Sequence, residues 1–369
     1  MIRVIHFMPS INVTSGIAQM IMNYYRTIDR SKIQFDFVYF IKKSEVNFEN
    51  EIITLGGSCT EVTPPSKYKK FNEDMNKLFN CYKDKNVVFH NHQIYFGVFL
   101  EPILRRNNIN NIIVHNHMTK YSDKILSSIR NRILCIPIKF LNVKYFACSY
   151  DAGVFMFGKK NIESITIMNN GIDCKKYCYN SNSRELIRKE LGLENKYILG
   201  HVGHFEKVKN HRFILEVFEE LRKMNKEAHL LLVGTGTLRK KIQEYATKRG
   251  IINNITILEN RSDIAAIMSC MDVFIFPSLF EGLGIAAIEA QATGLPVFMS
   301  ENVPKDVDIV NCNMLRLNES PQKWAKAINN TRVSEYDRKK ANKIVIKSKF
   351  NILKLEKKYF DYIIKLYEE

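Results

Sequence analysis

The stretch VFIFPSLFEGLGIAAIEAQATGLPVFM, residues Val273–Met299, holds the pattern that decides the fold. Its first apolar run, Val273–Pro277, predicts a short buried strand, and Gly284–Thr293 predicts a helix. A second apolar run, Pro296–Met299, predicts the next strand. Strand, helix and strand in that order predict a right-handed βαβ unit within a parallel sheet.

The same alternation of short apolar runs and helical stretches extends over the rest of the chain. Upstream of this stretch, strands are expected at Lys196–Val202, His229–Val233 and Ile255–Leu258, with helices at Asn210–Asn225, Thr237–Arg249 and Asp263–Met271. In the first half, strands are expected at Arg3–Met8, Gln34–Phe40, Asn86–His92, Asn110–His117, Tyr145–Ser149 and Ser164–Met168. Continuous apolar runs are typical of strands covered on both faces, so we expect doubly wound α/β sheets.

A chain of 369 residues is too long for one ordinary hydrophobic core, and two domains are expected. We expect an N-terminal Rossmann-like domain at 1–175, a C-terminal Rossmann-like domain at 176–345 and a docking helix at 346–369. The junction Asn170–Asn182 is polar and rich in turn residues. The docking helix is expected to pack on the body through one apolar side, formed by Phe350, Leu353, Phe360, Ile363, Ile364 and Tyr367.

Composition predicts a folded protein of the cytoplasm. Hydrophobic residues make up 46% and charged residues 25%, which excludes a disordered chain. Pro9 and Asn12 interrupt the first apolar stretch, so no secretory signal is expected, and the apolar stretch 133–148 is too short to span a bilayer. The 8 cysteines are scattered, which favours reduced thiols over disulfides or a metal framework.

The formal net charge is +17, and bases concentrate between residues 101 and 150. That stretch has only two acids, Glu101 and Asp123, against eight bases. The bases are Arg105, Arg106, Lys120, Lys124, Arg130, Arg132, Lys139 and Lys144. Their alternation with Ile, Leu, Phe and Tyr suits an anionic membrane surface, although it would also suit nucleic acid or a solvated basic face.

Ligands of open α/β sheets bind beyond the carboxyl ends of the strands, so the loops there are the candidate sites. Gly16 follows the first strand and opens a helix, where a phosphate or sugar can approach the backbone; a glycine before a helix is also common without function. In HVGHFEKVKN, residues 201–210, Gly203 allows a tight turn, and Lys207 and Lys209 can reach a diphosphate as point charges.

Two predicted strands end in the same tripeptide, HNH, at 90–92 and 115–117. Alternate residues of a strand share a face, so four histidines would gather if the two strands are neighbours. A zinc site is conceivable, but no carboxylate or cysteine lies nearby to complete it. We therefore favour a sugar or phosphate contact and expect no metal.

The segment PSLFEGLGIAAIEA, residues 277–290, carries the clearest chemical signal. Glu281 lies in the loop, where its oxygens can accept hydrogen bonds from sugar hydroxyls, and Gly282 and Gly284 leave backbone N–H groups accessible. Glu289 lies in the helix among apolar residues, and because burying a lone carboxylate is costly, it needs a partner or an adjacent cavity. The alternative is an ordinary amphipathic helix.

Taken together, the motifs resemble those of the family 4 glycosyltransferases of the GT-B fold, especially the bacterial capsule and exopolysaccharide enzymes. The resemblance covers nearly the whole chain. It rests on SGIAQMIMNYYR, IQFDFVYF, the two HNH strand ends, IMNNGID, VGHFEKVKNH, LLLVGTG, FPSLFEGLGIAAIEAQATGLPV and ENVPKDVD, in family order. It implies two Rossmann-like doubly wound domains that face each other across a cleft.

The resemblance also implies roles for individual residues. Lys209 would neutralise the leaving diphosphate, Glu281 would hold the donor sugar and Glu289 would bind the nucleotide ribose. The implied donor site comprises Gly16, His204, Lys207, Lys209, Thr235, Gly236, Glu281, Gly282, Leu283, Gly284 and Glu289. The implied sugar-transfer and acceptor site is lined by His92, His115 and His117, and the implied catalytic residues are Lys209, Glu281 and His117. His204 stands where the family commonly has Arg, which leaves more of the positive charge to the lysines.

The implied activity is retaining, metal-independent transfer of a sugar from a UDP- or GDP-sugar, without a cofactor. The acceptor would be a saccharide, most naturally lipid-linked and at the inner face of the plasma membrane, in capsule or exopolysaccharide synthesis. Two alternatives share the fold: a nucleotide-sugar epimerase or hydrolase, and a non-catalytic partner that binds sugar nucleotides. A nucleic-acid-binding protein is suggested by charge alone, and no motif supports it.

Overall fold

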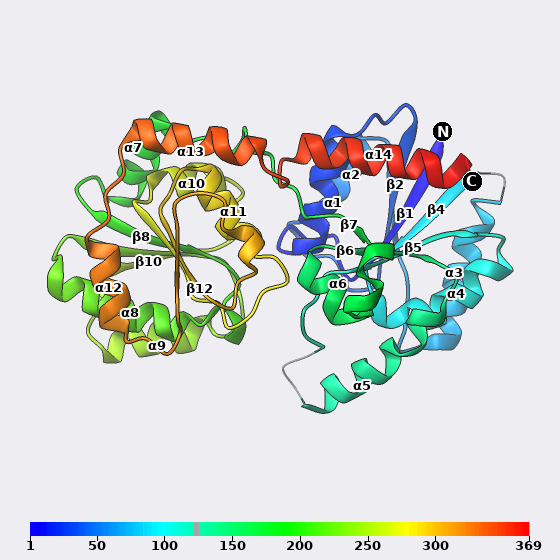
Figure 1. The fold of residues 1–369 in the computed structure, drawn as a ribbon, viewed down its shortest axis with the longest axis horizontal. Helices are drawn as coiled ribbons and strands as arrows, with labels where there is room; N and C mark the ends of the chain where they lie inside the picture. The colour runs from blue at the N-terminus through cyan, green and yellow to red at the C-terminus, as the bar shows by residue number, and fades with distance from the viewer. Residues whose placement is uncertain (84, 122–124, 369) are drawn as a thin grey trace. The chain divides into compact units, whose positions relative to one another are not determined.

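The computed structural model describes residues 1–83, 85–121 and 125–368. The chain forms two compact units (Figure 1): an N-terminal unit of residues 1–171 together with the segment from Ile352 onward, and a C-terminal unit of residues 172–351. The boundaries differ from the expected 175/176 and 345/346. At the first, Ile172 already donates its N–H to the Phe350 carbonyl at 2.9 Å within the C-terminal unit. At the second, helix α13 (Glu335–Lys347) continues past residue 345.

In the described residues of the N-terminal unit, seven parallel strands form one sheet in the order β3-β2-β1-β4-β5-β6-β7. The strands are β1 (Ile2–Met8), β2 (Ile33–Tyr39), β3 (Ser58–Glu61), β4 (Asn86–Asn91), β5 (Asn111–Asn116), β6 (Lys144–Ala147) and β7 (Thr166–Ile167). The α-helices are α1 (Gly16–Thr27), α2 (Glu49–Thr54), α3 (Tyr68–Asn80), α4 (Gly97–Arg106), α5 (Ile125–Cys135), α6 (Tyr150–Phe157) and α14 (Ile352–Glu368), with short 3₁₀ helices η1 (Ile94–Phe96), η2 (Pro137–Phe140) and η3 (Lys159–Ser164).

Hydrophobic clusters cover both faces of this sheet, which confirms the doubly wound prediction. One cluster packs α1 and α14 against the sheet, and the other packs α3, α4 and α6 against the opposite face. The side of α14 that packs inward was predicted in part: Ile363 is buried, and Phe360 and Ile364 are partly buried against the same hydrophobic cluster. Its buried residues are Ile352, Leu355, Tyr359, Ile363 and Leu366, whereas Leu353 and Tyr367 are exposed and Phe350 packs in the C-terminal unit.

In the C-terminal unit, six parallel strands form a sheet in the order β10-β9-β8-β11-β12-β13 within the described residues. They are β8 (Tyr197–Val202), β9 (Ala228–Val233), β10 (Ile255–Leu258), β11 (Val273–Phe276), β12 (Val297–Ser300) and β13 (Cys312–Leu315). The α-helices are α7 (Ser181–Leu191), α8 (His211–Met224), α9 (Arg239–Lys248), α10 (Ile264–Cys270), α11 (Ile285–Ala292), α12 (Pro321–Asn329) and α13, with η4 (Lys207–Lys209), η5 (Ile252–Asn254) and η6 (Lys305–Val307). Helices α8, α9 and α12 cover one face, and α7, α10, α11 and α13 cover the other.

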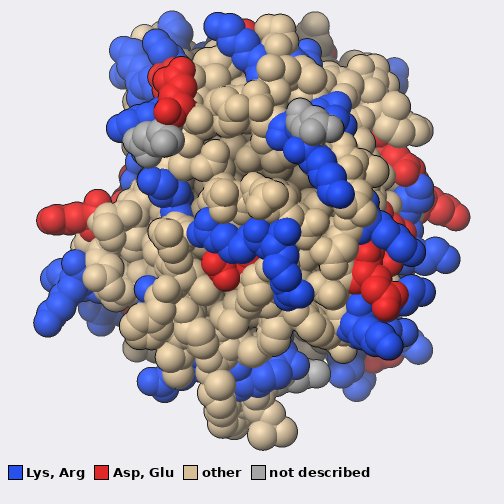
Figure 2. Space-filling model, turned by 90° about the vertical axis from the view of Figure 1, so that its right-hand side faces the viewer, with Lys and Arg blue, Asp and Glu red and all other residues tan. Residues whose placement is uncertain are grey.

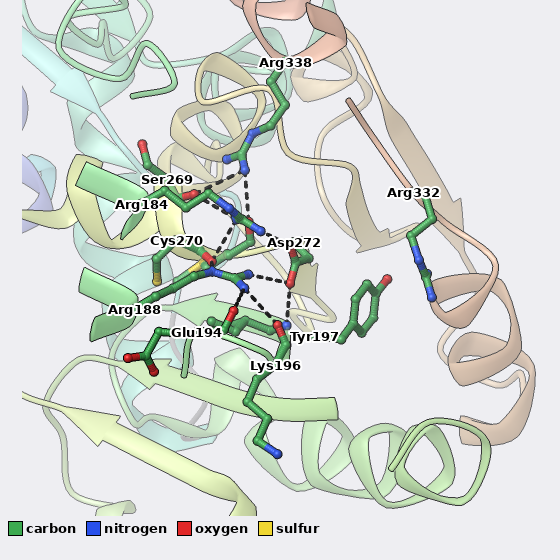
Figure 3. A network of polar contacts seen from close by, with 12 residues as sticks. Arg184, Arg188, Glu194, Lys196, Tyr197, Ser269, Cys270, Asp272, Arg332 and Arg338 are labelled. Carbon is green, nitrogen blue, oxygen red and sulfur yellow. Dashed lines mark hydrogen bonds and ion pairs between the residues drawn. The ribbon is translucent and has the colours of Figure 1, made fainter. Parts of the chain in front are cut away.

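A polar network ties three helices of the C-terminal unit together (Figure 3). Arg184 and Arg188 of α7 bind the Asp272 carboxylate at 2.6 and 2.8 Å. These two arginines and Arg338 of α13 donate to carbonyls of residues 268–271, at the C-terminal end of α10. Helix C-terminal carbonyls lack intrahelical partners, so the guanidinium groups satisfy them. Burial lowers the pKa of Arg338 to about 9, which leaves it charged at neutral pH.

No helix in the described part of the chain combines the length and the apolar character needed to cross a bilayer.

Candidate functional site

The sheet of the C-terminal unit reverses its strand order between β8 and β11. In open α/β sheets this switch point is where ligands bind, at the carboxyl ends of the strands. The loops after β8 and β11 meet there, because the Leu279 N–H donates to the Val208 carbonyl at 2.8 Å. The two motifs that carried the sequence interpretation, HVGHFEKVKN and PSLFEGLG, are therefore neighbours in space.

Lys209 and Glu281 form an ion pair at this switch point. Lys209 Nζ lies 2.5 Å from Glu281 Oε1, and the two side chains are only 16% and 12% exposed. The ammonium group also lies 4.8 Å from the centre of the Phe276 ring at the end of β11. Packing thus holds together a cation and a carboxylate that can accept hydrogen bonds from sugar hydroxyls. Lys207, on the same loop as Lys209, is exposed.

Glycines shape the neighbouring loops. Gly236, after β9, has φ of +152°, and a Cβ there would lie 2.7 Å from backbone atoms of Phe205. This close approach lets Phe205 N–H donate to the Thr235 carbonyl at 2.8 Å, while His204 Nδ1 lies 3.2 Å from the same oxygen. Gly284 has φ of +91° and caps the start of α11, a conformation that residues with a Cβ rarely adopt. The preceding Gly282 and Leu283 complete the turn that follows Glu281.

Glu289 lies on α11, and its partner is a residue that sequence reasoning missed. The Tyr177 hydroxyl donates to Glu289 Oε1 at 2.6 Å. Burial raises the pKa of the carboxyl to about 7, although the Tyr177 hydrogen bond and the charge of Lys176 work in the opposite direction. The carboxyl therefore titrates in the neutral range. Tyr177 lies 112 residues from Glu289 in the chain, and no local pattern links them.

The sheet of the N-terminal unit reverses its order between β1 and β4. Gly16, the first residue of α1, follows β1 and is exposed, with no heavy atom within 4 Å of the place where a Cβ would lie. Ser15 caps the helix by accepting the Ala18 N–H at 3.3 Å. The first turn of α1 is thus open to a ligand at the carboxyl edge of the sheet.

The two HNH strand ends lie side by side, because β4 and β5 are neighbours. This confirms the expected gathering of four histidines, and His6 of β1 joins them as a fifth that was not predicted. His6 Nδ1 lies 2.9 Å from His92 Nε2, and His92 Nδ1 lies 3.0 Å from His117 Nε2. A second chain runs from Tyr359 of α14 through His90 to His115, with distances of 2.9 and 3.2 Å.

Burial keeps these imidazoles neutral. It lowers the pKa of His6 and His117 to about 3, and it lowers the pKa of His90, His92 and His115 well below the usual value. A neutral imidazole donates one hydrogen bond and accepts another, so each ring can link two neighbours. Two triples, His6 with His90 and His92, and His92 with His115 and His117, each bring one ring nitrogen per residue within 4.8 Å of the others, close enough to be candidate metal ligands. Some of these nitrogens already face another imidazole: both ring nitrogens of His92 do so, one toward His6 and the other toward His117.

The basic stretch 101–150 contains a helix with an exposed apolar side. In α5, in η2 and at the residue between them, six apolar side chains are each more than half exposed: Ile125, Leu126, Ile129, Ile133, Ile136 and Phe140. Arg130, Arg132 and Lys139 lie among them in the sequence and are exposed. In Figure 1, α5 lies at the outer edge of the N-terminal unit, and the corresponding lower end of the face in Figure 2 is mostly uncharged, with Lys and Arg beside it. Two of the charged residues counted in the stretch 101–150, Asp123 and Lys124, lie outside the residues that the structure describes.

Two Rossmann-like units, each with candidate ligand-binding loops at its switch point, form the architecture of the GT-B class of glycosyltransferases. The comparisons with known proteins agree. The family model described as glycosyl transferases group 1 matches residues 183–348. The putative glycosyltransferase EpsF of Bacillus subtilis is 30% identical over 339 residues, which cover 88% of this chain and 86% of the relative. The chain therefore belongs to this glycosyltransferase family.

A second relative and a solved structure are similar over most of their length. The capsular polysaccharide biosynthesis glycosyltransferase CapH of Staphylococcus aureus is 26% identical over 349 residues, 89% of this chain and 90% of the relative. The crystal structure of Anabaena Alr3699/HepE, in complex with UDP and glucose, superposes with a TM-score of 0.81 at 16% identity, covering 98% of this chain and 99% of that one. At that identity the likeness shows the fold.

Proposed function

We propose that this glycosyltransferase moves a sugar from a UDP- or GDP-sugar to a lipid-linked saccharide during capsule or exopolysaccharide synthesis, with retention and without a metal ion. The observation that carries the proposal is the Lys209–Glu281 pair at the switch point of the C-terminal sheet. The capsular role is supported by the similarity to CapH, and the nucleotide donor by the fold shared with a protein crystallised with UDP and glucose.

The chemistry of the pair suits glycosyl transfer. The bond between the anomeric carbon and the diphosphate oxygen breaks, and a bond to the acceptor oxygen forms in its place. Negative charge builds on the departing diphosphate, and Lys209 supplies a fixed positive charge there, with N–H groups at the start of α11 adding to it. Glu281, once released from Lys209 by the incoming diphosphate, accepts hydrogen bonds from the donor sugar. The acceptor hydroxyl gives up its proton, which leaves with the phosphate.

The remaining residues would bind the nucleotide part of the donor and the transferred sugar or the acceptor. Glu289 would accept hydrogen bonds from the ribose hydroxyls, and the Thr235–Gly236 turn would border the base. In the N-terminal unit, His92, His115 and His117 would contact the transferred sugar or the acceptor, and Gly16 would leave space for a phosphate. Because the imidazoles are neutral, they would act through hydrogen bonds rather than through charge.

Helix α5 would hold the protein at an anionic membrane surface. Ile125, Ile129 and Ile133 recur every four residues and so lie on one side of the helix, as in helices that lie in the membrane interface. Each nearby base adds about 1 kcal/mol on an anionic surface, so Arg130, Arg132 and Lys139 together would give salt-sensitive binding. A lipid-linked acceptor makes this location useful.

Donor binding is the direct test. UDP or GDP should bind the full-length protein in the presence of EDTA, and Glu289→Ala should weaken binding at least tenfold, as measured by calorimetry. Strict dependence on magnesium, or unchanged binding by the variant, would contradict the assignment. Release of free sugar or epimerised nucleotide at full rate without acceptor would favour the hydrolase or epimerase alternative, and tight binding with no turnover on any acceptor would favour the non-catalytic one.

Membrane binding is tested separately by co-sedimentation with vesicles of phosphatidylcholine, with and without phosphatidylglycerol. The protein should sediment with the anionic vesicles and be released by high salt. Replacing Arg130, Arg132 and Lys139 by Glu should abolish sedimentation while leaving UDP binding intact. Equal recovery with neutral and anionic vesicles would argue against an electrostatic membrane contact.

A further inference from the structure

A cavity of about 380 Å³ lies in the N-terminal unit beside the C-terminal end of α5. It is lined by Tyr121, Arg132, Cys135, Ile136, Lys139 and Phe155. These residues come from the segment after β5, from α5, from η2 and from α6. The volume falls within the range of about 300–1,000 Å³ that is typical of small-molecule sites. None of the residues assigned to donor or acceptor binding lines it.

The charged part of the cavity wall is cationic. Arg132 and Lys139 are its two charged residues, and among the residues that the structure describes neither side chain forms an ion pair or hydrogen bond. The remaining titratable groups stay neutral, because burial raises the pKa of the Cys135 thiol to about 12 and also raises that of the Tyr121 hydroxyl. A guanidinium and an ammonium on a neutral wall favour an anion, and the fork of the guanidinium suits a phosphate group.

The other part of the wall is apolar and continues to the surface. The rings of Tyr121 and Phe155 lie 4.7 Å apart and pack against each other. Ile136 lines the cavity and is also 55% exposed, next to the exposed Ile133 and Phe140. A ligand that fits both parts therefore has an anionic end for the cavity and a hydrocarbon part for the exposed side of α5.

We propose that this cavity binds the phosphate end of a membrane phosphate ester, with Arg132 and Lys139 holding the phosphate and Ile133, Ile136 and Phe140 contacting the hydrocarbon. The inference rests on the proposed membrane location and makes it specific. A charged surface attracts any anionic membrane without fixed stoichiometry, whereas a cavity of this size holds one phosphate end per protein. The same chemistry occurs in an anionic phospholipid and in a lipid-linked acceptor.

The proposal is tested with the full-length protein and water-soluble short-chain lipids below their micellar concentration. Dihexanoyl phosphatidic acid should bind with one-to-one stoichiometry by calorimetry, and dihexanoyl phosphatidylcholine should bind at least tenfold more weakly. The double variant Arg132→Gln with Lys139→Gln should weaken phosphatidic acid binding at least tenfold. The matched control, Lys159→Gln with Lys160→Gln, removes the same charge from exposed positions outside the cavity and should change the affinity by less than twofold.

Three results would overturn the inference. Equal losses in the two double variants would show that net charge alone attracts the lipid. Saturation far above one lipid per protein would show surface adsorption. If inorganic diphosphate matched phosphatidic acid in affinity and in its response to the variants, the site would be one for free anions. Thermal unfolding midpoints of the two variants must agree with the wild type, and unchanged UDP binding separates a failure here from a failure of the proposed glycosyl transfer.

Discussion

Replacing Glu289 by Gln is expected to stabilise the protein at alkaline pH and to weaken donor binding. Burial raises the pKa of this carboxyl from 4.5 to about 7 in the folded state. As the pH rises, the unfolded chain releases the proton near pH 4.5 and the folded chain only near pH 7. The folded state therefore binds more protons in this window, and the free energy of unfolding falls as the pH rises through it.

The size of the effect follows from the raised pKa. At 1.36 kcal/mol per pKa unit, the rise of the Glu289 pKa from 4.5 to about 7 lowers the free energy of unfolding above pH 7 by about 3 kcal/mol. Glutamine keeps the shape of the side chain and can still accept the Tyr177 hydrogen bond, but it carries no charge to desolvate. Glu289→Gln should therefore raise the free energy of unfolding by about 2 to 3 kcal/mol at pH 8 and by less than about 1 kcal/mol at pH 5.

The single tryptophan of the chain gives a suitable signal, because Trp324 is fully buried in the C-terminal unit that contains Glu289. Urea unfolding followed by its fluorescence at pH 5 and pH 8 measures the effect, with the exposed Glu194→Gln as a control. A stability difference between wild type and Glu289→Gln that is the same at both pH values would refute the reasoning. UDP titration of the same variants should show that the more stable protein binds more weakly, since sites built for function often cost stability.

Three further substitutions test the site and the fold. Lys209→Ala should lower turnover roughly a hundredfold in a sugar-transfer assay while affecting donor affinity less, and Lys207→Ala should have the smaller effect. His204→Arg, which restores the common family residue, should raise the rate in the same assay if that position limits charge stabilisation; a slower enzyme would indicate that His204 suits a different donor geometry. Asp272→Asn should lower the free energy of unfolding, followed by Trp324 fluorescence, by about 3 kcal/mol, because it removes the counter-charge from a partly buried arginine network; an unchanged midpoint would contradict this role.

Much of the fold could be predicted because most strands are continuous apolar runs. The strand at Ile255–Leu258 matches its expected bounds, and others differ by a residue or two. Two edge strands were missed, β3 (Ser58–Glu61) and β13 (Cys312–Leu315). Each is four residues long and only partly buried, so it lacks the apolar run that reveals a central strand.

Individual site residues could be predicted where each lies in a recognisable motif. Their contacts could not be predicted where the partner comes from a distant segment of the chain. Lys209 and Glu281 could each be found from their loops, but the contact between them depends on the neighbouring positions of β8 and β11. His6 lies inside an apolar strand with no tripeptide to mark it, and its place beside His90 follows from the register of β1 and β4. The helical pattern of the C-terminal segment was recognised, but the segment is apolar on several sides, and its inner side could not be chosen from spacing alone.

The position of α14 has a consequence for the order of events during synthesis. The segment from Ile352 onward completes the first unit, so the core around Tyr24 and Phe35 remains uncovered until that segment has been made. Ribosomes add about 5–20 residues per second, and residues 172–351 are made in between, so the delay is on the order of tens of seconds. The C-terminal unit can therefore be complete before the N-terminal one. A premature stop just before Ile352 would consequently damage the beginning of the protein, and the cell would meet it as a chain with an unfinished first half.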